Sequence, residues 1–139
     1  MRTFFDSGIL AYLFDADSPG KQERVRKLLR EETAEGRVVL STQGLLEFFA
    51  AVTQGMAVPL PDETAERALA DLARLPMVQV DASMIRAAAA LARKESVPFQ
   101  DAVAVEAALA GGANRLFTEA LRNGRAFGDL TVVNPFTLG

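Results

Sequence analysis

The stretch "RTFFDSGILAYLF", residues 2–14, contains the pattern that decides the fold. Its first part is an apolar run that stops at an acid, which predicts a short buried strand over residues 2–6. "GILAYLF", residues 8–14, then predicts a short helix. Asp6 interrupts the apolar run of "TFFDSGIL" without a cationic neighbour, so a functional role explains it better than a structural one.

The alternation of strand and helix continues along the chain. The next helix is predicted to begin at the N-cap Ser18 and at Pro19, and to end at Gly36. After it we expect strands over 37–42, 77–81, 114–118 and 130–134, helices over 43–54, 59–75, 82–96 and 99–112, and a tail at 134–139. This order predicts an α/β fold, a three-layer α/β/α sandwich with a central parallel sheet and helices on both faces. Because the 139 residues contain no internal repeat or linker, we expect a single domain, residues 1–139.

The composition narrows the chemistry that is available. The chain has no cysteine and no histidine, which excludes disulfides, thiolate zinc sites and imidazole catalysis.

Asp6 interrupts the N-terminal apolar stretch and no cleavage site follows it, so we expect neither a signal peptide nor a membrane span, with the cytoplasm as the default location. The net charge of −3 argues weakly against a large phosphate-binding surface. The five cations of "KQERVRKLLR", residues 21–30, are better explained as a solvated helix face.

Acidic residues gather where such a sheet binds ligands. In open parallel sheets the binding crevice lies beyond the carboxyl ends of the strands. Asp6 ends the first strand, and Glu119 directly follows "RLFT". Glu47 and Asp101 are in the first turns of helices that are expected to begin near the same edge. We therefore expect these four acids to form one cluster.

Two of the acids also have ordinary structural explanations. Asp101, taken alone, is better explained as an acid that complements the helix dipole in the first turn. Its apolar neighbours weaken that explanation, because a half-buried carboxylate needs a partner or a cation. Glu47 fits an exposed helical residue equally well.

The cluster as a whole indicates a cation. Carboxylates without histidine or cysteine are the ligands that Mg²⁺ or Mn²⁺ prefers. Several acids in contact also repel one another unless something neutralises them. With such metals the usual chemistry is phosphoryl transfer, so the residues favour metal-dependent phosphodiester hydrolysis.

Several stretches resemble PIN-domain proteins of the VapC type, the toxin half of bacterial toxin–antitoxin pairs. They are "FFDSGILAYLFDADSPGKQERVRKLL", "VVLSTQGLLEFF", "PFQDAVAVEAAL", "RLFTEALRNGR" and "VVNPF", which together run almost from end to end of the chain. The resemblance implies a Rossmann-like PIN fold and an endoribonuclease that depends on Mg²⁺ or Mn²⁺. It also implies a type II toxin–antitoxin system, in which the toxin is usually a homodimer and is inhibited by a cognate VapB-like antitoxin.

The resemblance also assigns site residues. Asp6 matches the first family acid, in its D-[ST]-N motif, and Glu47 matches the acid of the helix after the second strand. Asp101 matches the acid that opens the buried helix, and Thr118 matches the hydroxyl residue of the T-x-D motif. Thr118 and Ser7 are expected to support the metal ligands through hydrogen bonds.

Two positions depart from the family pattern. Gly8 stands where the family usually has Asn, and Ala120 stands where T-x-D would supply a fourth acid. Glu119 is the first candidate to replace that acid and Asp129 the second, although neighbouring side chains after a strand point in different directions. The missing acid predicts a slow or single-metal nuclease.

Three functions remain open from the sequence. The first is a metal-dependent ribonuclease weakened at Ala120, which contacts RNA phosphates without reading their sequence through Lys94, Arg122 and Arg125. The second is a catalytically inactive PIN-fold protein that binds an antitoxin or RNA. The third is a small α/β hydrolase of phosphorylated metabolites, although the chain lacks a Gly-rich phosphate loop.

Overall fold

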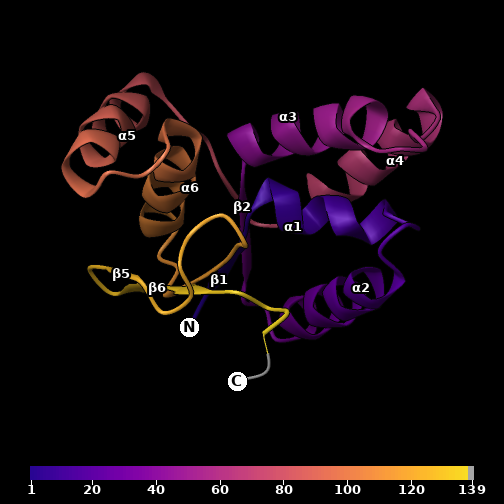
Figure 1. Cartoon of the computed structure of the whole chain (residues 1–139), viewed down its shortest axis with the longest axis horizontal. Helices are drawn as coiled ribbons and strands as arrows, with labels where there is room; N and C mark the ends of the chain where they lie inside the picture. The colour runs from indigo at the N-terminus through magenta and orange to yellow at the C-terminus, as the bar shows by residue number, and fades with distance from the viewer. Residues whose placement is uncertain (138–139) are drawn as a thin grey trace.

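The chain folds around a six-stranded sheet (Figure 1). The computed structural model describes residues 1–137, so the last two residues of the expected tail and domain, 138–139, lie outside the described residues. The strands lie in the order β3-β2-β1-β4-β6-β5. Their bounds are Thr3–Phe5 (β1), Val38–Ser41 (β2), Met77–Val78 (β3), Arg115–Phe117 (β4), Ala126–Phe127 (β5) and Leu130–Val133 (β6). Neighbouring strands are parallel, except that β5 pairs with β6 in the antiparallel sense.

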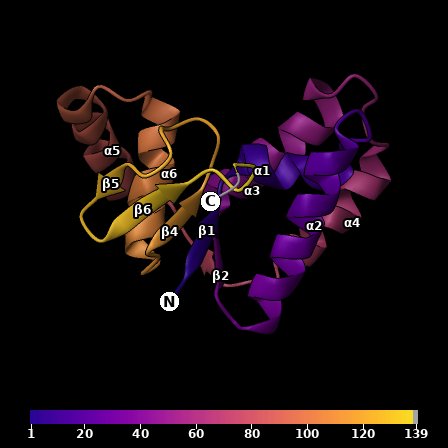
Figure 2. The same cartoon turned by 60° about the horizontal axis from the view of Figure 1, so that its bottom comes forward.

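Helices cover both faces of the sheet and complete three layers. Helices α5 and α6 lie on one face, while α1 to α4 lie on the other (Figures 1 and 2). The helical segments are Ser7–Ala11 (α1), the 3₁₀ helix Tyr12–Phe14 (η1), Pro19–Ala34 (α2), Thr42–Ala50 (α3), the π-helix Ala51–Gly55 (η2), Asp62–Leu72 (α4), Ala82–Glu95 (α5) and Phe99–Ala110 (α6). The predicted α/β/α sandwich is therefore confirmed. None of these helices, within residues 1–137, is long and apolar enough to cross a membrane.

Each face of the sheet has its own hydrophobic core. Successive side chains of a strand point to opposite faces. Phe4 accordingly packs in one cluster with Val105 of α6, and Phe5 packs in the other with Val25 of α2 and Phe48 of α3. Helix α6 buries residues on most of its surface, as its apolar composition predicts. The first strand therefore stabilises both cores at once.

Several predicted helices have different ends in the structure. The helix predicted over 8–14 is α-helical only to Ala11, and the helix predicted over 43–54 changes to a π-helix after Ala50. The helix predicted over 59–75 is shorter and runs from Asp62 to Leu72. Leu60 and Leu75 each precede a proline, which disfavours helical backbone at both positions. These corrections leave the order of the elements unchanged.

Ser18 is the N-cap residue of α2, as predicted, although its side chain makes no capping hydrogen bond. One detail of the prediction was wrong. The sheet is not wholly parallel, because the two-residue strand β5 folds back onto β6 through a turn in which Gly128 has a φ of +60°. That left-handed backbone favours glycine, and so short a strand leaves no periodic pattern in the sequence.

A buried ion-pair cluster lies at the amino-terminal edge of the sheet. Glu32 of α2 is only 3% exposed and accepts hydrogen bonds from the Thr3 hydroxyl at 2.7 Å and from Arg37 Nε at 2.7 Å. Arg115, at the start of β4, forms an ion pair with Glu32 and donates to the Thr3 hydroxyl at 2.8 Å. Burial alone raises the pKa of Glu32, but the hydrogen bonds from Thr3 and Arg37 and the two Arg charges outweigh it and bring the pKa below its ordinary value of 4.5. This acid is fully neutralised within the chain.

Candidate functional site

Asp6 lies at the junction between β1 and α1, at the carboxyl edge of the sheet. Its backbone N–H donates to the Phe117 carbonyl at 3.1 Å, which fixes it beside the end of β4. One carboxylate oxygen accepts from the Ser7 N–H at 2.8 Å and caps α1, and the other accepts from the Thr118 hydroxyl at 2.8 Å. The strand end predicted to present this acid therefore does so, with both oxygens oriented.

Glu47 faces the same junction from α3. This helix begins directly after β2, where Ser41 accepts a hydrogen bond from the Gly44 N–H at 3.0 Å and so caps it. One Glu47 oxygen accepts from the Ser7 hydroxyl at 3.0 Å, and the other accepts from the Gln43 amide at 3.3 Å. Ser7 thus contacts Glu47 through its side chain and Asp6 through its backbone. Glu47 is half-buried and is not an ordinary exposed residue.

Asp101 approaches from the first turn of α6, and its negative charge acts on Asp6. Burial raises the pKa of Asp6 above its ordinary value of 3.8, the hydrogen bonds from Thr118 and Ser7 oppose that rise, and the charges of Asp101 and Glu47 add to it. Burial also raises the pKa of Asp101, and the charge of Glu47 adds to that rise. Among residues 1–137 no ion pair involves any of these three acids. The carboxyl edge therefore holds negative charge that the described chain does not neutralise.

The donor set suits a divalent cation, although the acids do not form a closed cage. Carboxylate oxygens are the ligands of Mg²⁺ and Mn²⁺, and the nearby negative charges that raise the pKa values of Asp6 and Asp101 favour a bound positive charge. Within the described part of the chain, no three acidic side chains lie close enough together to bind one ion. Magnesium sites commonly use one or two carboxylates and complete the ion with water and substrate phosphate. The acids Asp6, Glu47 and Asp101 fit that open kind of site.

The turn after β4 carries Thr118, Glu119 and Ala120, where the family pattern has its fourth acid. The Ala120 N–H donates to the Thr118 hydroxyl at 3.0 Å, and Ala120 itself supplies no carboxylate. Glu119 accepts from the Tyr12 hydroxyl at 2.6 Å and pairs with Lys21 at 2.6 Å, so its two oxygens are bound to η1 and α2. Both oxygens of the Glu119 carboxylate therefore have partners outside the group formed by Asp6, Glu47 and Asp101.

Asp129 lies at the other end of the sheet from the acids. It directly precedes β6, which runs parallel to β4 with Arg115 opposite Thr131. The start of β6 is consequently at the amino-terminal edge, while Asp6 and Thr118 are at the carboxyl edge. The structure excludes Asp129 as a replacement for the missing acid.

The three cations expected to contact RNA have different surroundings. Lys94 is exposed in the last turn of α5, and Arg122 is exposed in the loop beyond β4. Arg125 is partly buried, donates to the Glu95 carbonyl at 2.8 Å and lies 4.9 Å above the ring of Phe127. Arg125 therefore helps to join the loop to the end of α5.

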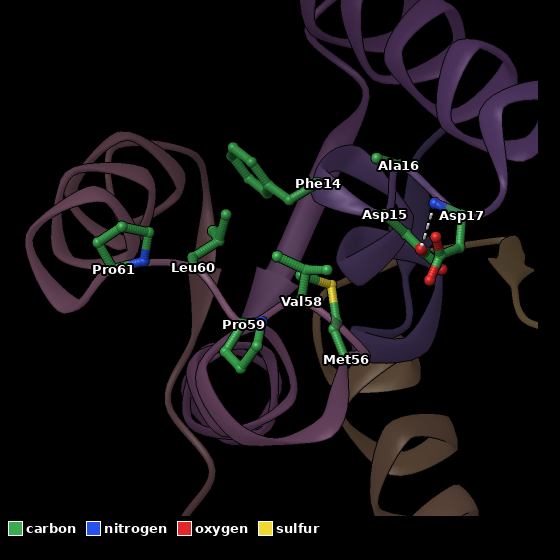
Figure 3. Close-up of a pocket in the computed structure, with 9 residues that line it drawn as sticks. All are labelled: Phe14, Asp15, Ala16, Asp17, Met56, Val58, Pro59, Leu60 and Pro61. Atoms are coloured by element: carbon green, nitrogen blue, oxygen red, sulfur yellow. Dashed lines mark hydrogen bonds between the residues drawn. The ribbon is translucent and has the colours of Figure 1, made fainter.

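A separate apolar pocket lies away from the acids. It is formed by Phe14 of η1 and by the segment between η2 and α4, including Met56, Val58 and Leu60, and it has a volume of about 250 Å³ (Figure 3). Asp15 and its neighbour Asp17 lie on one side of it, and none of the candidate acids lines it. This pocket lacks the convergent polar groups of a catalytic site.

The sequence did not identify three residues that bind acidic side chains in the site or next to it. Gln43 could have been found, because it lies four residues before Glu47 on one helix and such pairs are neighbours. Tyr12 and Lys21 bind Glu119 across 107 and 98 residues of chain. No local pattern marks contacts of that range.

Comparisons with known proteins identify the family and the fold of the chain. Residues 3–120 match the model of the PIN domain family. A toxin–antitoxin complex from Klebsiella pneumoniae has a similar structure, with a TM-score of 0.71 and 15% identity over 98% of this chain and 99% of that one. The sarcin–ricin loop cleaving toxin VapC20 of Mycobacterium tuberculosis has a TM-score of 0.62 and 19% identity over 82% of this chain and 86% of its own. No curated protein matches by sequence.

The two structural similarities have low identity and show a shared fold. The family match is independent of them and covers most of the chain, from the first residue of β1 to the turn after β4. It includes Asp6, Glu47, Asp101 and Thr118. The chain therefore belongs to the PIN domain family.

Proposed function

We propose that this protein is a metal-dependent endoribonuclease of the VapC type, the toxin of a type II toxin–antitoxin pair. One observation carries the proposal: Asp6, Glu47 and Asp101 lie at the carboxyl edge of the sheet, near enough for the charges of Glu47 and Asp101 to raise the pKa of Asp6, without a cationic partner in residues 1–137. Membership of the PIN domain family supports it, as does the shared fold with a toxin that cleaves the sarcin–ricin loop.

Each acid has a role that follows from its contacts. A bound Mg²⁺ or Mn²⁺ would lower the pKa of water and neutralise charge on the phosphate. Asp6 and Glu47, held by Ser7, Thr118 and Gln43, would be the oriented ligands. Asp101 makes no side-chain hydrogen bond within the described residues, so its carboxylate would be available to bind the cation and to orient the attacking water.

Ala120 sets the expected level of activity. A fourth acid would add negative charge to the site, and a second cation depends on that charge most strongly. We therefore expect slow, single-metal cleavage from Asp6, Glu47 and Asp101. RNA phosphates would be bound mainly by the exposed Lys94 and Arg122.

The partners follow from the same assignment. One solved structure of this fold is a toxin–antitoxin complex, which supports a VapB-like antitoxin as the partner of this chain. A homodimer in the cytoplasm is the expected form of the toxin. The cleavage assay below uses the chain free of antitoxin.

The proposal is tested by cleavage of a structured RNA with Mn²⁺ or Mg²⁺ by the purified protein. Asp101→Asn and Asp6→Asn are each expected to lower the cleavage rate by on the order of 10²–10³-fold, because each removes a charge at the reacting centre. Glu106→Gln, on the same helix as Asp101, is the control and should cleave normally. Cleavage that persists unchanged in Asp101→Asn would mean that another protein or another site is responsible.

A second function is favoured by Ala120 and by the absence of a three-acid cage within residues 1–137. In it the fold binds an antitoxin or RNA without cleaving. It predicts tight association with the product of an adjacent small gene, and no cleavage in the same assay from either the natural chain or Ala120→Asp.

A further inference from the structure

A cluster of four side chains joins the turn after β4 to η1 and α2. We name it the Glu119 latch, and its members are Tyr12, Lys21, Glu119 and Phe136. Both oxygens of Glu119 are bound, one by the Tyr12 hydroxyl and the other by Lys21 Nζ, each at 2.6 Å. Lys21 Nζ lies 5.0 Å from the Tyr12 ring centre and 4.9 Å from that of Phe136, and the two rings pack edge to face at 5.3 Å.

The latch lies one residue from the hydrogen bond that orients Asp6. The Thr118 hydroxyl accepts from the Ala120 N–H at 3.0 Å and donates to Asp6 at 2.8 Å. Glu119 stands between these two residues in the chain. Its anchored side chain therefore limits how the backbone of the turn can rotate.

The local charges account for the strength of this attachment. Burial alone raises the pKa of Glu119, but the hydrogen bonds from Lys21 and Tyr12 outweigh it and bring the pKa below its ordinary value of 4.5. The carboxylate is consequently ionised near neutral pH and accepts from both partners. Because the side chains of Lys21 and Glu119 are 40% and 33% exposed, the pair should contribute little to global stability. Its effect should be local.

We infer that Glu119 is a positioning residue, which holds the turn over residues 118–120 through Tyr12 and Lys21 so that the Thr118 hydroxyl donates to Asp6. The inference rests on the proposed ribonuclease function for its catalytic consequence. It also explains why the carboxylate next to the missing family acid does not replace it. Glu119 acts through Thr118, and does not contact the reacting atoms.

The first measurement is amide hydrogen exchange at Ala120, without metal or RNA. In Glu119→Ala the Ala120 N–H should exchange about tenfold faster, because the turn that carries its acceptor is released. Glu31→Ala is the matched control, since it also removes an exposed glutamate that pairs with a lysine, here Lys27 at 4.0 Å. Unchanged exchange in Glu119→Ala would overturn the inference, whatever the outcome of the cleavage assay.

The second measurement separates positioning from general damage. Glu119→Ala should lower kcat for RNA and the affinity for Mn²⁺ by about tenfold, while KM and the melting temperature stay close to those of the natural chain. Thr118→Val should have a similar effect on kcat, and Thr118→Ser, which keeps the hydroxyl, should restore it. Adding Glu119→Ala to Thr118→Val should then cause no further loss. Independent, multiplying losses in the double variant would show that Glu119 does not act through Thr118.

Discussion

The acidic side chains at the two edges of the sheet have opposite electrostatic surroundings. At the amino-terminal edge, Glu32 is bound by Thr3, Arg37 and Arg115. At the carboxyl edge, Asp6 and Asp101 have neutral hydrogen-bonding groups or none, and each lies near further negative charge. The pKa of Glu32 is lowered, whereas the pKa values of Asp6 and Asp101 are raised.

This difference separates structural acids from functional ones. An acid that finds its cations within the chain stabilises the fold and needs no ligand. Acids that are partly buried near one another without cations reduce stability, and such an arrangement persists where a ligand or a reaction requires it. The sign of the pKa shift therefore distinguishes the two edges better than burial does.

The largest effect is expected when the buried ion-pair cluster at the amino-terminal edge loses the charge of Glu32. Glu32→Gln should lower the free energy of unfolding by about 2 kcal/mol at neutral pH, because Arg37 and Arg115 lose the charge that they bind. Urea unfolding measures this difference. RNA cleavage per folded molecule should stay unchanged, since Glu32 lies at the far edge.

The neighbouring residue offers a control for that change. Glu31 is exposed on the same helix and pairs with Lys27 at 4.0 Å. Glu31→Gln should change the free energy of unfolding by less than about 0.5 kcal/mol. Equal losses in the two variants would contradict the special role of the buried cluster.

An intermediate effect is expected when a fourth acid is added at the carboxyl edge. Ala120→Asp should raise the affinity for Mn²⁺ about tenfold and increase RNA cleavage, because it supplies the acid that the family pattern contains. Calorimetric titration of metal-free protein measures the affinity, and Ala120→Asn controls for shape without charge. If neither the natural chain nor Ala120→Asp binds Mn²⁺, the binding-only function is favoured.

The smallest effect concerns pH, and its sign differs between the two edges. Because the pKa of Asp101 is raised, the folded state is favoured by protonation of Asp101, and this stability is lost as the pH rises through the raised value. Asp101→Asn should therefore melt higher than the natural chain at about pH 7, with the advantage shrinking toward about pH 4. The stabilisation by Glu32 is present above its ordinary value of 4.5 and is lost as the pH falls through the lowered pKa. The measurement is the melting temperature of Asp101→Asn and Glu32→Gln between about pH 4 and pH 7. If both variants melted higher than the natural chain, or both lower, the contrast between the two edges would be contradicted.

The sequence predicted the parts of the fold that depend on local pattern. The strand ending at Asp6, the buried helix around Asp101 and the order of the layers all follow from periodicity and from parallel topology. The same topology placed Asp6 and Glu119 at one edge, and the family resemblance assigned Thr118, the residue before Glu119, to the site. The hydrogen bond between Asp6 and Thr118 confirms that they are neighbours.

The remaining features depend on contacts between distant residues. Glu32 lies just beyond the stretch of α2, residues 21–30, whose cations were expected to form a solvated face, and its burial depends on Thr3 and on Arg115, 83 residues further along. The direction of Glu119 is set in the same way by Tyr12 and Lys21. Side-chain partners of this range are fixed by packing, which leaves no periodic signal in the chain.

The central position of β1 has a consequence for synthesis of the protein. β1 is made before β2 and β4, yet it lies between them in the finished sheet. It can pair with β2 early, but its other side remains an open edge until residues 115–117 have been made. Until then Phe4 and Phe5 lack much of the surface that covers them, so the nascent chain depends on residues made more than 100 positions later to complete the pairing of β1.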